Sequence, residues 1–312
     1  MIIKEPLLKY FPPYLKLLSL GILILICLLF TLLIGILTAI PFFGTGVLEN
    51  ITSIDYSNPE TVSLLKYMQI INQLGLFILP PVIFAFLVNR NISGYLKLNQ
   101  KPKLLSIIIG TLIIFAAMPF LHWLSNINEM IKFPEFLSWL ENWMIESEKQ
   151  AAKLTETFLN VNTFNGFLFN ILMIAIIPGI GEELLFRGVL LRLFKEWTKN
   201  IHWAVFISAV LFSAFHLQFY GFSPRLMLGI LLGYMFVWTG SIWVPIFIHF
   251  INNAAAVIFV YIVNKNKLET NLESFGATDN LWLIIGSFLI VAVLLNVIYK
   301  KRGNIQNDIS SH

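Results

Sequence analysis

Two adjacent glutamates lie in a stretch of the chain that is otherwise uncharged. Glu182 and Glu183 follow Pro178-Gly179-Ile180-Gly181, and residues 157 to 181 contain no Asp, Glu, Lys or Arg. Carboxylates are costly inside a bilayer, and where they occur they commonly serve function. Arg187 stands four residues after Glu183, so the two side chains share one helix face and are expected to form an ion pair. Glu182 projects about 100° away on the same helix, which leaves it available as a base.

Two further polar groups stand on later apolar segments. His216 follows Phe212-Ser213-Ala214-Phe215, and His249 stands four residues before Asn253. The latter spacing puts both side chains on one helix face, aimed at one point. Counted from the expected cytoplasmic edges, Glu182, His216 and Asn253 lie about 20 Å deep, and His249 lies nearer the edge. We therefore expect these residues, with Glu183 and Arg187, to converge on one intramembrane polar cavity.

These residue types suit the hydrolysis of a peptide bond. A carboxylate and an imidazole that flank one water molecule can remove its proton during attack on a carbonyl. Histidine and asparagine donors on the opposite side could hold the developing oxyanion. No Ser or Cys has a base beside it, so an acyl-enzyme is not favoured. The same side chains could instead ligate zinc, although the His-Glu-x-x-His pattern of helical zinc proteases is absent.

Each of these groups also has a purely structural interpretation. A histidine or asparagine in a span often makes only a helix–helix hydrogen bond, and Glu183 with Arg187 could be a buried ion pair that fixes packing. A structural account of all six residues together must explain two carboxylates, two histidines and an asparagine at similar depth. Catalysis is therefore the favoured interpretation.

The composition is that of an integral membrane protein. Of 312 residues, 57% are hydrophobic and 12% are charged, with a mean hydropathy of +0.79, far above a soluble domain. The single Cys27 excludes an intramolecular disulfide. The net charge of +4 indicates no nucleic-acid partner, because the basic residues cluster beside hydrophobic runs and so point to the lipid bilayer. The first apolar run is expected to be a retained span, since it lacks a signal-peptide cleavage site.

Windows without charge predict an all-α polytopic protein of about eight transmembrane helices, forming a single membrane domain over residues 1–312. A span needs about 20 apolar residues, so the longest window is expected to split near Thr239-Gly240-Ser241. Basic clusters occur at every second loop, which predicts that both termini are cytoplasmic; Arg225 is an exception. The windows are residues 17–40, 67–89, 104–128, 157–181, 200–224, 226–264 and 280–299.

Two segments are not predicted to span the membrane. Residues 129–157 contain apolar side chains at helical spacing among charges, which predicts an extracytoplasmic amphipathic helix on the membrane surface. A small soluble helix packed on loops is the alternative. The polar tail, residues 303–312, is expected to be disordered.

The three motifs together resemble those of the CAAX protease and bacteriocin-processing (CPBP, or Abi) family of intramembrane endopeptidases, which includes the type II CAAX prenyl endopeptidases. The resemblance covers residues 164–263. It implies that Glu182 and His216 activate water, that His249 and Asn253 form the oxyanion site, and that Glu183 and Arg187 shape the site. Family members have been described both as metalloproteases and as metal-independent glutamate proteases. We favour the second for this chain and expect no cofactor, since the motifs supply few zinc ligands.

The expected function is that of an intramembrane endopeptidase acting on a membrane-associated peptide or protein, in a bacterial cytoplasmic membrane. A non-catalytic adaptor or bacteriocin-immunity protein is an alternative, but it would not need Glu182. A proton- or ion-coupled transporter is a further alternative, because intramembrane Glu and His suit it equally. Transporters often contain inverted repeats, and none is evident here. The sequence does not predict an oligomeric state.

Overall fold

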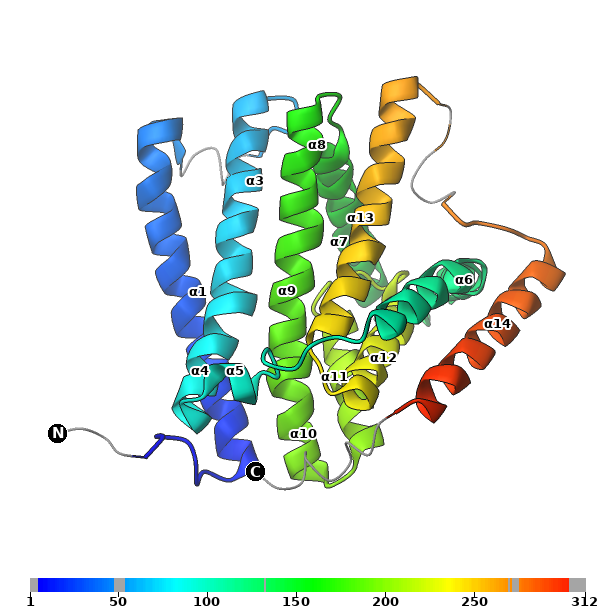
Figure 1. Cartoon of the computed structure of the whole chain (residues 1–312). Coiled ribbons are helices and arrows are strands. Elements are labelled where there is room, and N and C mark those ends of the chain that lie inside the picture. The colour runs from blue at the N-terminus through cyan, green and yellow to red at the C-terminus, as the bar shows by residue number, and fades with distance from the viewer. Residues whose placement is uncertain (1–4, 48–53, 132, 269, 271–274, 303–312) are drawn as a thin grey trace.

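The computed structural model describes residues 5–47, 54–131, 133–268, 270 and 275–302, and all regular structure in them is helical (Figure 1). The predicted all-α class is confirmed. Seven helices of the described chain are long and apolar enough to cross a membrane: Pro13–Phe43, Pro59–Asn89, Leu104–Glu129, Phe164–Thr198, Phe222–Thr239, Trp243–Asn266 and Leu281–Lys300.

Five of these are single α-helices, namely α1 (Pro13–Phe43), α6 (Leu104–Glu129), α12 (Phe222–Thr239), α13 (Trp243–Asn266) and α14 (Leu281–Lys300). The second long helix is built from α3 (Pro59–Gln73), the π-helical segment η1 (Leu74–Ile78) and α4 (Leu79–Asn89). The fourth is built from α8 (Phe164–Asn170), η3 (Ile171–Ile176), α9 (Ile177–Glu183), η4 (Leu184–Leu190) and α10 (Leu191–Thr198). Shorter elements are α5 (Ile92–Tyr95), η2 (Glu135–Leu137), α7 (Ser138–Leu159) and α11 (Ile201–Ala214).

The longest window divides where the sequence predicted. Helix α12 ends at Thr239, and Gly240 has a φ of 68°, a left-handed conformation that glycine adopts without steric cost. Helix α13 begins shortly afterwards, at Trp243. The predicted split near residues 239–241 is confirmed.

The window at residues 200–224 does not form one long helix, and that part of the prediction is wrong. Helix α11 has 14 residues, a length of about 21 Å, which is short of a hydrocarbon core of about 30 Å. It ends at Ala214, and Leu217 has a left-handed φ of 51°. An uncharged stretch shows that a segment is apolar but does not show where its helix stops. His216 therefore lies on a loop, residues 215–221, instead of inside a span.

Prolines account for two of the three π-helical segments. Segment η1 precedes Pro80 and Pro81, and η3 precedes Pro178. A proline inside a helix has no N–H and clashes with the carbonyl four residues earlier, and a wider π turn accommodates it. Segment η4 contains no proline. It begins directly after Glu183, and π turns are frequent at functional sites.

The segments predicted to be cytoplasmic contact one another at one end of the molecule, the lower end in Figure 1. Lys16, near the start of α1, forms an ion pair with Glu196 of α10 at 2.8 Å. The guanidinium of Arg192, also on α10, lies over the ring of Tyr95 on α5. The turn between α12 and α13 hydrogen-bonds to the loop after α5. The loops therefore segregate as the charge pattern requires, while the side of the membrane that they face stays a prediction.

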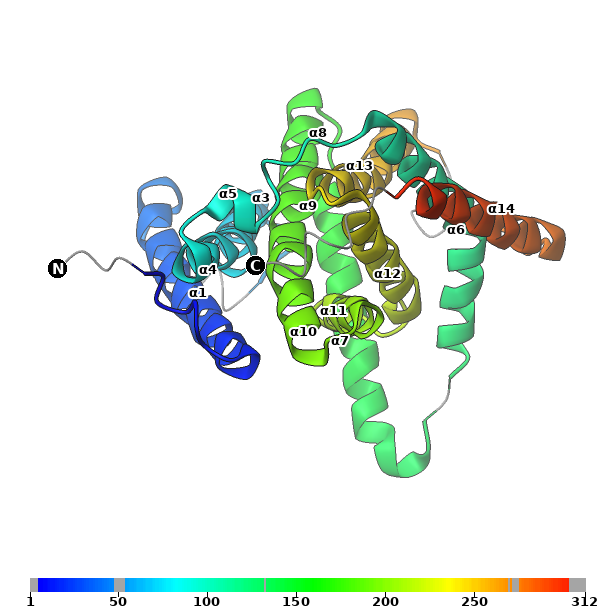
Figure 2. The same ribbon diagram turned by 60° about the horizontal axis from the view of Figure 1, so that its bottom comes forward.

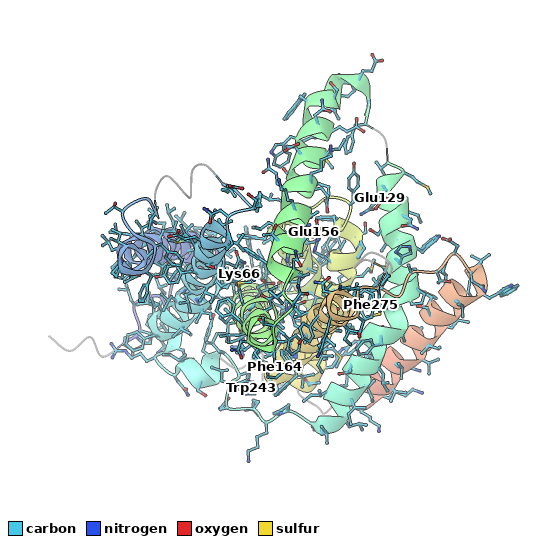
Figure 3. The ribbon with its side chains drawn as sticks, turned by 90° about the horizontal axis from the view of Figure 1, so that it is seen from above. Lys66, Glu129, Glu156, Phe164, Trp243 and Phe275 are labelled. Carbon is cyan, nitrogen blue, oxygen red and sulfur yellow. The ribbon has the colours of Figure 1, made fainter. Side chains whose placement is uncertain are left out.

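The predicted amphipathic segment contains helix α7, which projects from the bundle with the end of α6 as an arm (Figure 2). Seen from above, Glu129 and Glu156 lie on the two limbs of this arm (Figure 3). The inner end of α7 is anchored, because Asn170 donates from Nδ2 to the carbonyl of Phe158 at 2.7 Å. The position of α7 on the membrane surface stays a prediction, and the tail at 303–312 lies outside the described residues.

Candidate active site

Two glycines allow neighbouring helices to approach the segment that carries the glutamates. A Cβ atom on Gly179 would lie 3.3 Å from the backbone nitrogen of Phe250 on α13. A Cβ on Gly181 would lie 2.9 Å from the Cβ of Phe77 on η1. Positions two residues apart on a helix face nearly opposite directions, so α9 is held between α13 and η1. This packing brings α13 and its His249 against the two glutamates.

The predicted ion pair between Glu183 and Arg187 is present and buried. Arg187 Nη1 lies 2.7 Å from Glu183 Oε1, and the two side chains are 1% and 0% exposed. Arg187 Nη2 donates to the carbonyl of Gly229 at 3.0 Å, and the guanidinium lies 4.7 Å from the ring centroid of Phe212. Arg187 thus joins η4 to α12 and α11, and its charge is balanced by Glu183.

His249 contacts Glu183 directly. Its Nδ1 lies 2.8 Å from Glu183 Oε1, the oxygen that also accepts from Arg187. Since a carboxylate accepts, Nδ1 carries the proton. The sequence-based depth placed His249 nearer the membrane edge than Glu182, but the structure brings the two residues together.

The other ring nitrogen of His249 faces Glu182. Nε2 lies 3.9 Å from Glu182 Oε2, too far for a direct hydrogen bond and suited to a bridging water. Among the described residues, Glu182 Oε2 and Glu183 Oε2 are buried oxygens without a hydrogen-bond partner. Because buried carboxylate oxygens without partners are costly, these two atoms mark where water or substrate should bind.

His216 lies on the loop just after α11 and is half-buried. Its Nδ1 donates to the carbonyl of Phe212 at 2.9 Å, so Nε2 of the neutral ring has a free lone pair. The ring of Phe212 contacts His216 and His249, with centroids 5.2 and 5.8 Å away. Burial lowers the pKa of His216, and the charge of Glu182 partly opposes this effect. The ring of Phe212 therefore contacts both predicted site histidines.

Asn253 has a partner that the sequence analysis did not identify. Its Nδ2 donates to the carbonyl of Ile174 at 3.1 Å, and its Oδ1 accepts from Asn252 Nδ2 at 3.1 Å. In a regular α-helix, the N–H of residue 178 would pair with the carbonyl of residue 174, but Pro178 has no N–H. Asn253 therefore satisfies a carbonyl at the proline break. The signal in the sequence was the proline four residues after Ile174.

The donor set does not fit a zinc ion. Within the part of the chain that the structure describes, no group of three His, Cys, Asp or Glu side chains is arranged to hold a metal. A catalytic zinc needs about three protein ligands, and His249 uses Nδ1 to donate to Glu183. The mechanism proposed below therefore uses only side chains of the protein.

Comparison with known proteins gives a local match. Residues 164–255 match the family model described as "Type II CAAX prenyl endopeptidase Rce1-like", and all six candidate residues fall inside this segment. Two proteins of Bacillus subtilis (strain 168) are similar. "Uncharacterized protein YpbD" is 31% identical over 111 residues, 34% of this chain and 54% of that protein. "Putative membrane peptidase YdiL" is 29% identical over 120 residues, 38% of this chain and 46% of that protein.

The chain thus spans about half the length of the curated relatives it matches. No solved structure matches it. The family resemblance inferred from the three motifs is confirmed over the matched segment.

Proposed function

We propose that the protein is an intramembrane endopeptidase, because residues 164–255 match the model of the Rce1-like type II CAAX prenyl endopeptidases. Its substrate is a membrane-associated peptide or protein, in which it hydrolyses a peptide bond. The observation that carries the proposal is the buried network of Arg187, Glu183 and His249, which leaves the oxygen Oε2 of Glu182 buried without a partner. A network that only stabilised the fold would have no need of this second carboxylate.

In the proposed mechanism, a water molecule binds at Glu182 Oε2. Glu182 takes one proton from the water as its oxygen attacks the carbonyl carbon of the scissile bond. His216 accepts the second hydrogen of the water at Nε2 and so orients it. Glu182 then gives its proton to the leaving nitrogen when the tetrahedral intermediate collapses. The products are a carboxylic acid and an amine, which balances the addition of one water.

His249 has the complementary role. With Nδ1–H donated to the Glu183 carboxylate, an imidazolium form would place a second N–H at Nε2, on the side of Glu182. The Glu183 carboxylate, which also pairs with Arg187 at 2.7 Å, stabilises that charge. Nε2–H then donates to the oxyanion of the intermediate. Asn253 uses one of its two amide hydrogens on Ile174, and the other is available to the same oxyanion.

The decisive experiment compares wild type with Glu182→Gln, which keeps the shape of the side chain and removes the base. The purified proteins in liposomes are incubated with a library of internally quenched hydrophobic peptides. General-base catalysis contributes about 10²- to 10⁴-fold, so we expect cleavage to fall by that factor. Glu156→Gln, an exposed glutamate of α7, is the matched control and should cleave normally. Equal cleavage by wild type and Glu182→Gln would refute the mechanism.

A further inference from the structure

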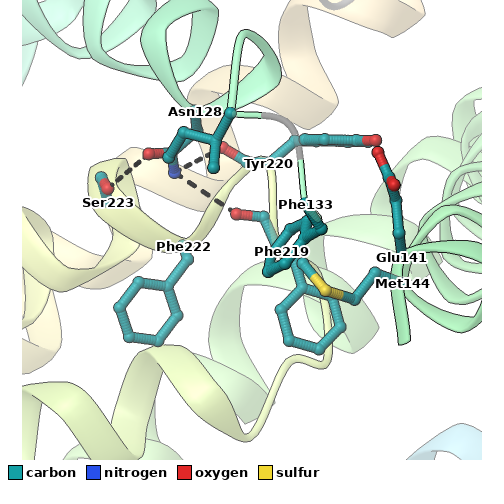
Figure 4. Close-up of a pocket in the computed structure, with 9 residues that line it drawn as sticks. Asn128, Phe133, Glu141, Met144, Phe219, Tyr220, Phe222 and Ser223 are labelled. Atoms are coloured by element: carbon teal, nitrogen blue, oxygen red, sulfur yellow. Dashed lines mark hydrogen bonds between the residues drawn. The ribbon is translucent and has the colours of Figure 1, made fainter. Parts of the chain in front are cut away.

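A cavity adjoins the loop that carries His216. It has a volume of about 260 Å³ and lies between the end of α6, the arm helix α7 and loop 215–221 (Figure 4). This volume falls just below the range of pockets that hold a whole small ligand, about 300–1,000 Å³, and suits one or two side chains. We call it the arm pocket. Its lining residues are Asn128, Ile131, Phe133, Glu141, Met144, Phe219, Tyr220, Phe222 and Ser223.

The wall of the arm pocket is held in place by hydrogen bonds to the loop backbone. Asn128 Nδ2 donates to the carbonyls of Phe219 and Tyr220 at 3.3 and 3.1 Å, and Ser223 Oγ donates to Asn128 Oδ1 at 2.8 Å (Figure 4). The backbone N–H of Tyr220 donates to Glu148 of α7 at 3.3 Å. His216 precedes Phe219 by three residues, so the pocket and the proposed active site share this loop.

The lining combines aromatic rings with a single carboxylate. Trp143 of α7 packs against Phe219 with ring centroids 5.3 Å apart, next to Met144. Within the described chain, no Lys, Arg or His side chain forms an ion pair with Glu141. A purely apolar occupant would remove water from Glu141 without offering it a partner, which is unfavourable. A lysine or arginine can place its aliphatic stem on the rings and its charge at the carboxylate.

We propose that the arm pocket is a substrate subsite that binds a lysine or arginine side chain of the peptide. This inference rests on the proposed function, because it gives the endopeptidase a preference for basic residues near the scissile bond. The arm as a whole has the matching charge, with six acidic and three basic residues between positions 129 and 156. Such an excess attracts cationic peptides before they bind.

The test measures binding separately from cleavage. Glu182→Gln protein in nanodiscs is titrated into short hydrophobic peptides labelled with a neutral fluorophore. Each peptide has one position occupied by lysine, by glutamate or by norleucine, which keeps the lysine stem and lacks the charge, and that position is moved along the peptide. We expect lysine at one position to bind about fivefold tighter than norleucine, as for a solvent-accessible ion pair. Adding Glu141→Gln should abolish the difference, and Glu141→Lys should reverse it in favour of glutamate.

Glu146→Gln on the exposed face of α7 is the control and should leave the lysine preference intact. Equal binding of lysine and norleucine peptides at every position, a preference that survives Glu141→Gln, or no binding at all would overturn the subsite. The proposed function fails differently, by an absence of cleavage that depends on Glu182. Cleavage without a lysine preference therefore refutes the subsite alone, and a preference that depends on Glu141 without cleavage refutes the endopeptidase alone.

Discussion

At Glu183, one carboxylate oxygen accepts hydrogen bonds from Arg187 on its own helix and from His249 on α13. Glu182, the next residue, has a buried oxygen without any hydrogen-bond partner among the described residues. Each glutamate has one buried oxygen without such a partner, but only Glu183 also binds Arg187 and His249 through its other oxygen. In the proposed mechanism, Glu183 is therefore the counter-charge that holds the histidine, and Glu182 is the base.

Part of this arrangement could be predicted from local spacing. The interval of four residues between Glu183 and Arg187 is enough to predict their ion pair, because helix geometry fixes which side chains meet. The contact of His249 with Glu183 depends on how α13 packs on α9, which Gly179 controls, and no spacing within one helix reveals it. The same holds for the contact of Asn253 with the carbonyl of Ile174.

The role of Asn253 can be tested by a double-mutant cycle with Pro178. Asn253→Ala removes a donor from the part-buried carbonyl of Ile174, and leaving a buried carbonyl unsatisfied costs up to about 1–3 kcal/mol. In the Pro178→Ala background, the restored N–H can pair with that carbonyl, so we expect Asn253→Ala to cost much less stability there. Heat denaturation in detergent measures the stability of wild type, the two single variants and the double variant. Equal losses in both backgrounds would show that Asn253 does not satisfy this carbonyl. Cleavage assays on the same four proteins distinguish this structural role of Asn253 from its proposed role in binding the oxyanion. Pro178→Ala can compensate for the lost hydrogen bond to Ile174, but it cannot restore cleavage that depends on Asn253.

The close approach of α9 to α13 brings His249 to the two glutamates. The atoms next to a Cβ on Gly179 belong to the backbone of Phe250, at 3.3 and 3.4 Å, and backbone yields less easily than a side chain. Phe250 follows His249 directly, so a shift here moves the histidine away from Glu183. The glycines before the glutamates lie inside α9 and therefore allow this close helix packing.

Gly179→Ala should consequently reduce peptide cleavage far more than it reduces heat stability. A misplacement of about 1 Å can cost on the order of 100-fold in rate, and that is the loss we expect in kcat. Gly21→Ala on α1 is the matched control, because a Cβ there meets nothing within 4 Å. Cleavage at the wild-type rate by Gly179→Ala would show that this contact does not position His249.

The loop after α11 shows why some elements escape prediction. Arg225 broke the charge pattern of the loops, and the structure gives the reason: its guanidinium donates to the carbonyl and the side-chain oxygen of Gln218. A side chain at Gly221 would clash with that guanidinium. Arg225 therefore holds the His216 loop, a tertiary role that a count of charges cannot reveal. The break at Gly240 was predictable because glycine commonly ends helices, and this can be read from the local sequence.

For the whole molecule, the alternation of basic loops and the contacts between them agree. Lys16, Glu196 and the loop after α5 lie at one end of the bundle. The acidic arm is anchored at the other end of the bundle, through the contact of Phe158 with Asn170 of α8. Packing shows which loops lie together at each end of the bundle. The charge pattern predicts which of the two ends faces the cytoplasm. Helix α11 is too short to cross the membrane alone. Together with loop 215–221 it would complete the eighth pass that puts both termini on the basic side.

This orientation predicts that the arm is exposed outside the cytoplasm and that loop 96–103 is inside. The single cysteine makes the test direct: in a Cys27→Ser background, Asn142→Cys on α7 and Lys101→Cys in the loop each provide one exposed thiol. We expect a membrane-impermeant maleimide to label Asn142→Cys in intact cells, and to label Lys101→Cys only after the membrane is disrupted. The reverse pattern would invert the topology, and labelling of both in intact cells would place the arm and the loop on one side. Only the predicted pattern brings extracytoplasmic peptides to Glu141 before they reach Glu182.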